Sequence, residues 1–85
     1  MMRAKEPHAE YDPEADAIYV WLTDGETVKS TQLDDFRNID FSGDGGVVGV
    51  EFLDVSGGVD LKDIPYSETV EKLIGELNLG IKIFA

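Results

Sequence analysis

The chain has 85 residues, which is enough for one small domain. Eighteen Asp and Glu residues against seven Lys and Arg give a formal net charge of -11. This charge argues against binding to nucleic acid or to an anionic membrane, because neutralising phosphates requires clustered cations. The absence of cysteine excludes disulfides, thiolate nucleophiles and Cys-ligated metal centres.

The amino-terminal part of the chain predicts short strands after a polar arm at residues 1–8. Residues 10–16 contain a proline and several acids, and they predict a short strand that turns into the next one. Residues 17–22 are β-branched and aromatic, so they predict a strand inside the sheet with apolar side chains on both faces. The Asp24-Gly25 pair that follows is typical of a tight hairpin turn.

Three further strands are predicted before residue 56. Loose alternation at residues 27–33 predicts an exposed strand, and residues 37–41 predict the next one. A glycine-rich turn at residues 42–46 leads into the run 47–55. Alternation places Arg37, Ile39 and Phe41 on one face of the strand at 37–41. In the same way, Val48, Val50 and Phe52 share one side of the last strand.

The carboxyl-terminal part predicts one helix and an apolar tail. From Ser67, a candidate N-cap, apolar residues recur at helical spacing through residues 67–78, and Asn78 and Gly80 suit the exit of the helix. The tail at residues 79–85 is apolar enough to be a pairing hazard if it were exposed. We therefore expect a short edge strand there that docks on the domain or pairs with another subunit.

These elements predict an α+β fold: a small antiparallel β-sheet of four or five strands with one C-terminal amphipathic helix. We expect a single domain over residues 1–85. It consists of a flexible polar arm at 1–8, a β-rich unit at 9–56, and the helix and tail at 57–85.

Part of the sequence resembles a known family. The residues that carry the resemblance follow in order: Tyr11-Asp12, Asp16, Ile18-Tyr19-Val20, Asp34-Asp35, Asp40 and the run Val48 to Ser56. They are similar to the small prokaryotic family known as domain of unknown function 2283, with departures at Val50, Phe52 and Val55. The resemblance implies a compact antiparallel β unit with no established activity. It also implies genes next to those of small toxins, and hence an antitoxin-like role for some members.

A calcium site is one alternative function. Residues 40–51 match the twelve-residue loop of an EF-hand, with oxygen ligands from Asp40, Ser42, Asp44 and Glu51. However, hairpin turns select Asp and Gly at the same positions, and an EF-hand needs a helix where this chain has valines. We therefore expect an ordinary β-hairpin and no bound metal.

A small enzyme built on carboxylates is a second alternative. Asp12, Glu14 and Asp16, with Glu10 before them, alternate as a set that could serve acid–base or metal chemistry. Asp residues also form turns by accepting backbone N–H bonds, which explains the same pattern without catalysis. The one histidine, His8, lies in the predicted arm. We therefore expect no catalytic residues, no cofactor and no enzyme activity.

We expect the protein to act by binding other proteins. Because a chain this short has a thin core, a second copy covering apolar surface would add stability. We predict a homodimer, with interface candidates Tyr19, Trp21, Ile81, Ile83 and Phe84. The negative charge makes a basic protein the other expected partner, in an antitoxin-like role. No run of residues matches a signal peptide or a membrane span, so we expect a cytoplasmic protein.

Overall fold

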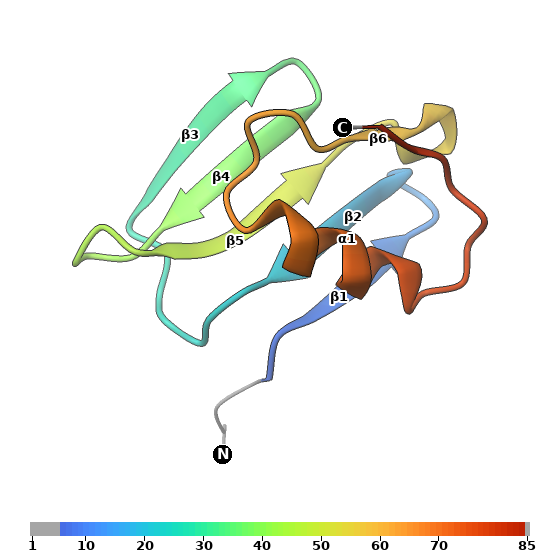
Figure 1. Cartoon of the computed structure of the whole chain (residues 1–85). Helices are drawn as coiled ribbons and strands as arrows, with labels where there is room; N and C mark the ends of the chain where they lie inside the picture. Colours follow the sequence, from blue (N-terminus) through green and yellow to red (C-terminus); the bar gives the residue numbers. More distant parts are fainter. Residues whose placement is uncertain (1–5, 85) are drawn as a thin grey trace.

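Five antiparallel strands form the main sheet, and one helix crosses one of its faces (Figure 1). The computed structural model describes residues 6–84. The strands lie in the order β1-β2-β5-β4-β3. Their bounds are His8–Asp12 for β1, Ala17–Trp21 for β2, Lys29–Asp34 for β3, Arg37–Phe41 for β4 and Val47–Phe52 for β5. The predicted α+β class, with an antiparallel sheet of four or five strands and a C-terminal helix, is confirmed.

Shorter elements follow the sheet along the chain. A 3-10 turn at Val55–Gly57 leads to β6 at Val59–Asp60, then to the helix α1 at Ser67–Gly75 and finally to β7 at Ile83–Phe84. The helix lies over β1 and β2, whereas the segment before it passes over β4 and β5 (Figure 1). The second half of the chain therefore covers one face of a sheet that the first half builds.

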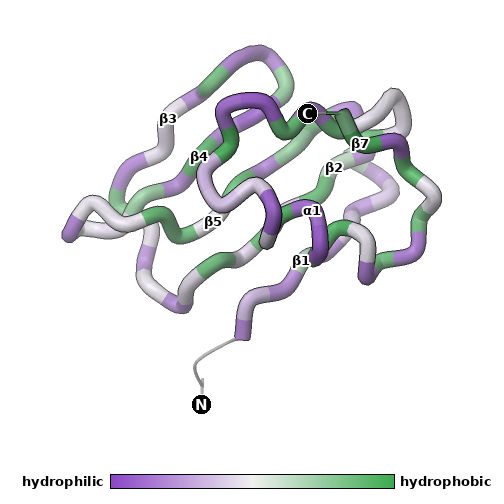
Figure 2. Tube along the Cα trace, in the orientation of Figure 1, coloured by the Kyte–Doolittle hydropathy of each residue, from purple (hydrophilic) through white to green (hydrophobic). Residues whose placement is uncertain are grey.

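Alternating side chains on the strands form the core against α1. Directly opposed residues in an antiparallel pair share a face, so the register places Ile18 beside Phe52 and Val20 beside Val50 on the helix side. All four side chains are buried. Val48, which shares their side of β5 as predicted, is buried as well. Figure 2 shows the matching pattern along the chain, in which β2 and β5 are largely hydrophobic and β3, exposed throughout, is mostly hydrophilic.

The Asp24-Gly25 pair does not form the tight hairpin turn that its sequence favours. β2 pairs with β1 and β5, whereas β3 pairs with β4 at the edge of the sheet. Residues 22–28 therefore form a longer connection from the inside of the sheet to its edge. The backbone N–H groups of Leu22 and Thr23 both donate to the carbonyl of Val48, at 2.7 and 3.2 Å, so pairing with β5 extends past the end of β2.

The helix begins where predicted and ends earlier than residue 78. Tyr66, not Ser67, occupies the N-cap position, with a left-handed backbone and no side-chain hydrogen bond to the helix. Asn78 and Gly80 adopt left-handed conformations at φ 55° and 69°, as expected of the exit from the helix. Val70, Leu73 and Ile74 are buried. Within residues 6–84, no helix is both long and apolar enough to cross a bilayer.

The apolar tail docks on its own domain. β7 pairs with β6 in parallel, and the N–H groups of Val59 and Leu61 donate to the carbonyls of Lys82 and Phe84 at 2.8 and 2.7 Å. The Phe84 ring lies against Gly58, whose φ of 117° favours glycine. The prediction of a short strand that docks is thus confirmed.

The boundary of the predicted polar arm is wrong by one residue. His8 is the first residue of β1, because it pairs with Trp21 and its ring packs on that side chain. Residues 6 and 7 of the predicted arm are exposed and belong to no strand, and residues 1–5 lie outside the described residues.

Arg37 fixes the segment that leads to the helix. Arg37 is 7% exposed, and its side chain donates to the Asp34 carboxylate at 2.7 and 3.0 Å. A third N–H group donates to the carbonyl of Asp60 at 3.0 Å, and Arg37 also bonds to the carbonyl of Lys62. The guanidinium of Arg37 keeps the pKa of Asp34 below its usual range. Residues 60–62, which precede α1 in the chain, are thereby held beside β4.

Candidate functional site

The face of the sheet opposite α1 is uncovered within the described part of the chain, since the helix and β6 lie on the other side (Figure 1). Backbone pairing arranges its side chains in two rows that cross all five strands. We call this surface the open face. Its residues are His8, Trp21, Gly49, Asp40 and Ser30 in the first row, and Glu10, Tyr19, Glu51, Asn38 and Gln32 in the second.

A hydrogen-bonded cluster occupies the middle of the open face. The Tyr19 hydroxyl donates to Asp40 Oδ2 at 2.6 Å, and the Ser30 hydroxyl donates to Asp40 Oδ1 at 2.6 Å. Burial of the Tyr19 ring, followed by its hydrogen bond to Asp40, raises the pKa of Tyr19 well above its usual range. The phenol therefore keeps its proton, and the Asp40 carboxylate is held by two hydroxyl groups.

Gly49 makes room for the Tyr19 ring. A Cβ atom built at Gly49 would lie 2.6 Å from the Tyr19 hydroxyl oxygen and 2.7 Å from Cε2. These separations are well below ordinary contact distance, so any side chain at this position would displace the ring. The glycine is required by the packing of its neighbour across the strand pair.

An aromatic stack forms the edge of the open face on β1 and β2. The His8 ring lies parallel to Trp21, with centroids 4.7 Å apart and an interplanar angle of 7°, and Tyr19 meets Trp21 edge-on at 4.5 Å. His8 Nδ1 lies 3.0 Å from the carbonyl of Glu6, and Nε2 lies 3.1 Å from Glu10 Oε2. Both ring nitrogens of His8 therefore face oxygen atoms of residues close to it in the chain.

The open face carries negative charge without a permanent cation. Three of its ten residues, Glu10, Asp40 and Glu51, are acids, and none is Lys or Arg. Asn38 Nδ2 donates to Glu51 Oε1 at 3.1 Å, which fixes that carboxylate beside Tyr19. The surface therefore combines partly exposed aromatic rings with carboxylates.

The four candidate calcium ligands do not converge. Asp40 and Glu51 lie on the open face and accept hydrogen bonds from other side chains. Ser42 and Asp44 meet in the β4–β5 turn, where the Ser42 hydroxyl and then the Gly46 N–H lower the pKa of Asp44. β5 occupies the place where an EF-hand would have its helix. Within residues 6–84, no three His, Asp or Glu side chains are grouped so that they could hold a metal ion.

The candidate catalytic acids have separate structural partners. Asp12 Oδ1 accepts the backbone N–H of Glu14 at 3.0 Å, as in a turn. Asp16 accepts the hydroxyl of Ser56 at 2.6 Å, the Ser56 N–H at 3.1 Å and the Tyr11 hydroxyl at 3.3 Å. This cluster ties the β1–β2 turn to the 3-10 turn that ends the sheet. Asp12 and Asp16 therefore each accept hydrogen bonds within a separate structural contact.

Replacing Asp16 by Asn should destabilise the protein at neutral pH and have a smaller effect in strong acid. The hydrogen bond from the Ser56 hydroxyl keeps the pKa of Asp16 below its ordinary value of 3.8. Such a carboxyl stabilises the fold above its ordinary pKa, and this contribution is lost as the pH falls through the lower folded value. Asn tolerates the left-handed backbone of Asp16, at φ 53°. Urea midpoints of both proteins at about pH 7 and about pH 2 measure the difference, which should shrink in acid. An equal difference at the two pH values would contradict it.

The predicted interface residues fall on two different sides of the molecule. Tyr19 and Trp21 lie on the open face, not against the helix. Ile81 and Ile83 are partly buried against the core, and Phe84 is 50% exposed beside Gly58. Sequence reasoning missed His8, Asp40 and Glu51 as neighbours of Tyr19 and Trp21. Only the alternation of His8 with Glu10, matching that of Tyr19 with Trp21, hinted at a shared face.

Comparison with known proteins gives one family match. The model of a family described as "Protein of unknown function (DUF2283)" matches residues 8–56. No curated protein and no solved structure matches the chain. The matched segment comprises all five strands of the main sheet and ends at Ser56, the partner of Asp16. It therefore includes the whole open face and leaves out α1.

Proposed function

The chain belongs to the DUF2283 family, whose function is unknown, and we propose a function from the chain's own residues. The protein is a non-enzymatic binding protein, and its open face binds a basic segment of another protein. The observation that carries the proposal is the composition of the open face. It displays carboxylates beside the rings of His8, Tyr19 and Trp21 and has no Lys or Arg.

The chemistry of such a surface favours arginine. A guanidinium stacks on aromatic faces and also makes paired hydrogen bonds to carboxylates. In the stack of His8 on Trp21, with Glu10 bonded to the same ring, a planar nitrogen-containing ring is already held between an aromatic face and a carboxylate. Tyr19, placed between Asp40 and Glu51, offers the same combination in the middle of the face.

Charge also favours a foreign partner over a second copy. Two open faces brought together would oppose three acids with three acids, in a chain whose formal charge is already -11. Like charges across an interface suppress association, whereas complementary charges raise its rate. A homodimer, which the thin core predicts, would have to use another surface, and light scattering tests that prediction separately.

A more specific form of the proposal names the partner. In this form the protein is an antitoxin-like neutraliser of a basic protein that is encoded beside it. The net charge of -11 supports this form, because it favours a basic partner. We expect a neighbouring gene for a small basic protein whose toxicity disappears on co-expression. If co-expression leaves the toxicity unchanged, the antitoxin-like role is contradicted, and only the proposal that the open face binds a basic segment remains.

Titration with an oligo-arginine peptide tests the proposal, because Trp21 is the only tryptophan and lies on the open face. Fluorescence of Trp21 should change saturably, and the apparent affinity should fall as salt rises from about 50 to about 300 mM. Oligo-lysine of equal charge should bind more weakly, since an ammonium lacks the planar stacking surface. Equal binding of the two peptides would contradict stacking on the open face.

Paired charge variants locate the binding surface. Replacing Glu10 and Glu51 by Gln removes two charges from the open face while keeping side-chain size, and should weaken binding by about threefold to tenfold. The matched control replaces Glu71 and Glu76 by Gln as well. Glu71 is exposed on α1 and Glu76 is exposed just after it, so both lie on the other side of the sheet. If the control pair weakens binding as much, attraction by net charge explains the result and the open face is not the site.

A further inference from the structure

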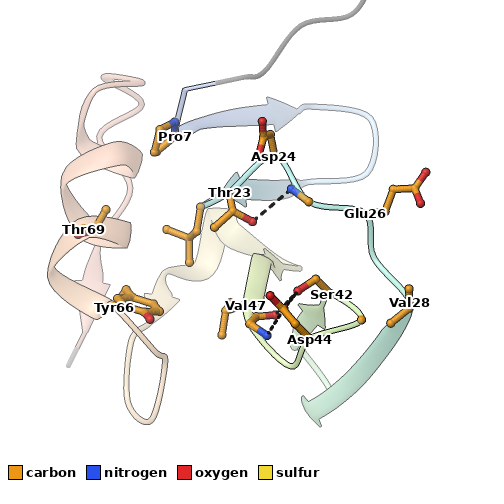
Figure 3. A pocket seen from close by; sticks show the side chains of 14 residues that line it. Pro7, Thr23, Asp24, Glu26, Val28, Ser42, Asp44, Val47, Tyr66 and Thr69 are labelled. Atoms are coloured by element: carbon orange, nitrogen blue, oxygen red, sulfur yellow. Dashed lines mark hydrogen bonds between the residues drawn. The ribbon is translucent and has the colours of Figure 1, made fainter.

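A groove lies at one end of the sheet, away from the open-face rows. It has a volume of about 900 Å³ and is formed by the β2–β3 connection, the β4–β5 turn and the start of α1. Figure 3 shows Tyr66 and Val28 on opposite sides of it, with Thr23 and Val47 between them. A groove of this size exceeds the volume of one side chain and falls within the range of ligand sites in proteins.

The walls of the groove include unusually exposed apolar groups. Tyr66 is 67% exposed and Val28 is 66% exposed, the two largest values among the exposed large hydrophobic residues from 6 to 84. Tyr66 is held there by a left-handed backbone at φ 55°, a conformation that non-glycine residues seldom adopt. Leu22 and Val47, which also pack against the core, extend the apolar surface inward.

The rim of the groove is acidic. Three of its fourteen lining residues, Asp24, Glu26 and Asp44, are acids, and none is Lys, Arg or His. The Asp44 carboxylate is fixed by the Ser42 hydroxyl and by the Gly46 N–H, the latter at 3.0 Å. A ligand that matches this lining carries positive charge on either side of an apolar group.

We propose that this groove binds a short peptide segment in which an aliphatic side chain is flanked by Lys or Arg. The aliphatic side chain would pack between Tyr66 and Val47, and the flanking cations would meet Asp24, Glu26 and Asp44. The size of the groove favours several residues of an extended chain, and the charge of its rim excludes an acidic one. This site is separate from the open face and does not depend on binding there.

The experiment titrates the isotope-labelled full chain with the blocked peptide Lys-Leu-Lys-Leu-Lys and follows backbone amide signals by NMR. Shifts should concentrate at five residues that line the groove: Gly25, Gly43, Asp44, Gly46 and Thr69. The peptide Lys-Ser-Lys-Ser-Lys, which has the same charge and no aliphatic group, should bind about tenfold more weakly. Shifts at Tyr19, Trp21 and Gly49 would show binding at the open face instead. The experiment therefore shows separately whether the peptide binds the groove and whether it binds the open face.

Two matched variants complete the test. Tyr66→Asn removes the ring while keeping a residue that tolerates a left-handed backbone, and should weaken Lys-Leu-Lys-Leu-Lys binding by about tenfold. The control Phe36→Asn removes a ring that is 52% exposed at the β3–β4 turn and should leave binding within about twofold. Equal affinity for the two peptides, an unaffected Tyr66→Asn variant, or shifts spread evenly over the acidic surface would each overturn the proposal.

Discussion

Replacing Gly49 by Ala should destabilise the protein by about 3 kcal/mol or prevent it from folding. A Cβ atom at this position would lie 2.5 Å from the carbonyl oxygen of Val20 and 2.6 Å from the Tyr19 hydroxyl. β5 cannot shift to relieve the contact, because it is paired with β2 on one side and with β4 on the other. The strain therefore falls on the backbone of the central strands and on the hydrogen bond from Tyr19 to Asp40.

A glycine elsewhere in the chain provides the control. Gly75 is the last residue of α1, and a Cβ atom there meets nothing within 4 Å. Gly75→Ala should stabilise the protein by about 0.5–1 kcal/mol, because alanine restricts the unfolded chain and favours the helix. Urea unfolding of both variants measures the two changes. A Gly49→Ala variant as stable as the unchanged protein would show that Tyr19 does not need the space above Gly49.

Ending the chain after Tyr66 should abolish folding, although the five strands that match the family model would remain. Without α1, the buried side of the sheet loses the contacts that Val70, Leu73 and Ile74 make with it. The exposed apolar face would include Ile18, Val20 and other residues that are now buried, and a sheet needs such a face to be covered. Circular dichroism and amide signal dispersion test the expectation. A dispersed spectrum from the shortened chain would contradict it.

A single substitution tests the same packing without removing a segment. Ile74→Ala should cost about 2–4 kcal/mol, because Ile74 is only 3% exposed and the shorter side chain would leave a cavity in the core. Glu76→Ala, at an exposed position just after α1, should change stability by less than about 0.5 kcal/mol. If the two variants were equally stable, α1 would not be part of the cooperative core.

Local patterns were sufficient to predict the strands of the main sheet, the helix and the buried side of the sheet, but not the 3-10 turn or β6. Val48, Val50 and Phe52 alternate in β5, and Val70, Leu73 and Ile74 recur at helical spacing in α1, so each set follows from the geometry of one element. The acidic turns were predictable for the same reason, since Asp12 accepts an N–H group two residues ahead.

Strand order and the open face depend on contacts between distant segments. The Asp24-Gly25 pair favours a hairpin between neighbouring strands, but β5 lies beside β2, and no local pattern indicates that placement. The same pairing brings Asp40 to Tyr19, and the turns at the other end bring Asp16 to Ser56, forty residues away. For this reason Asp40 and Glu51 appeared in the sequence as candidate calcium ligands rather than as neighbours of aromatic residues.

The central claim is that the open face binds a basic segment, and mapping the contact on the full chain tests it most directly. During titration with oligo-arginine, amide shifts should concentrate along the two rows that contain Trp21, Gly49 and Asp40, and Tyr19, Glu51 and Asn38. Signals from the exposed residues of α1 should stay in place at about 0.15 M salt, where distant charges are largely screened. Shifts along α1 equal to those on the open face, or no saturable shift at all, would contradict the claim.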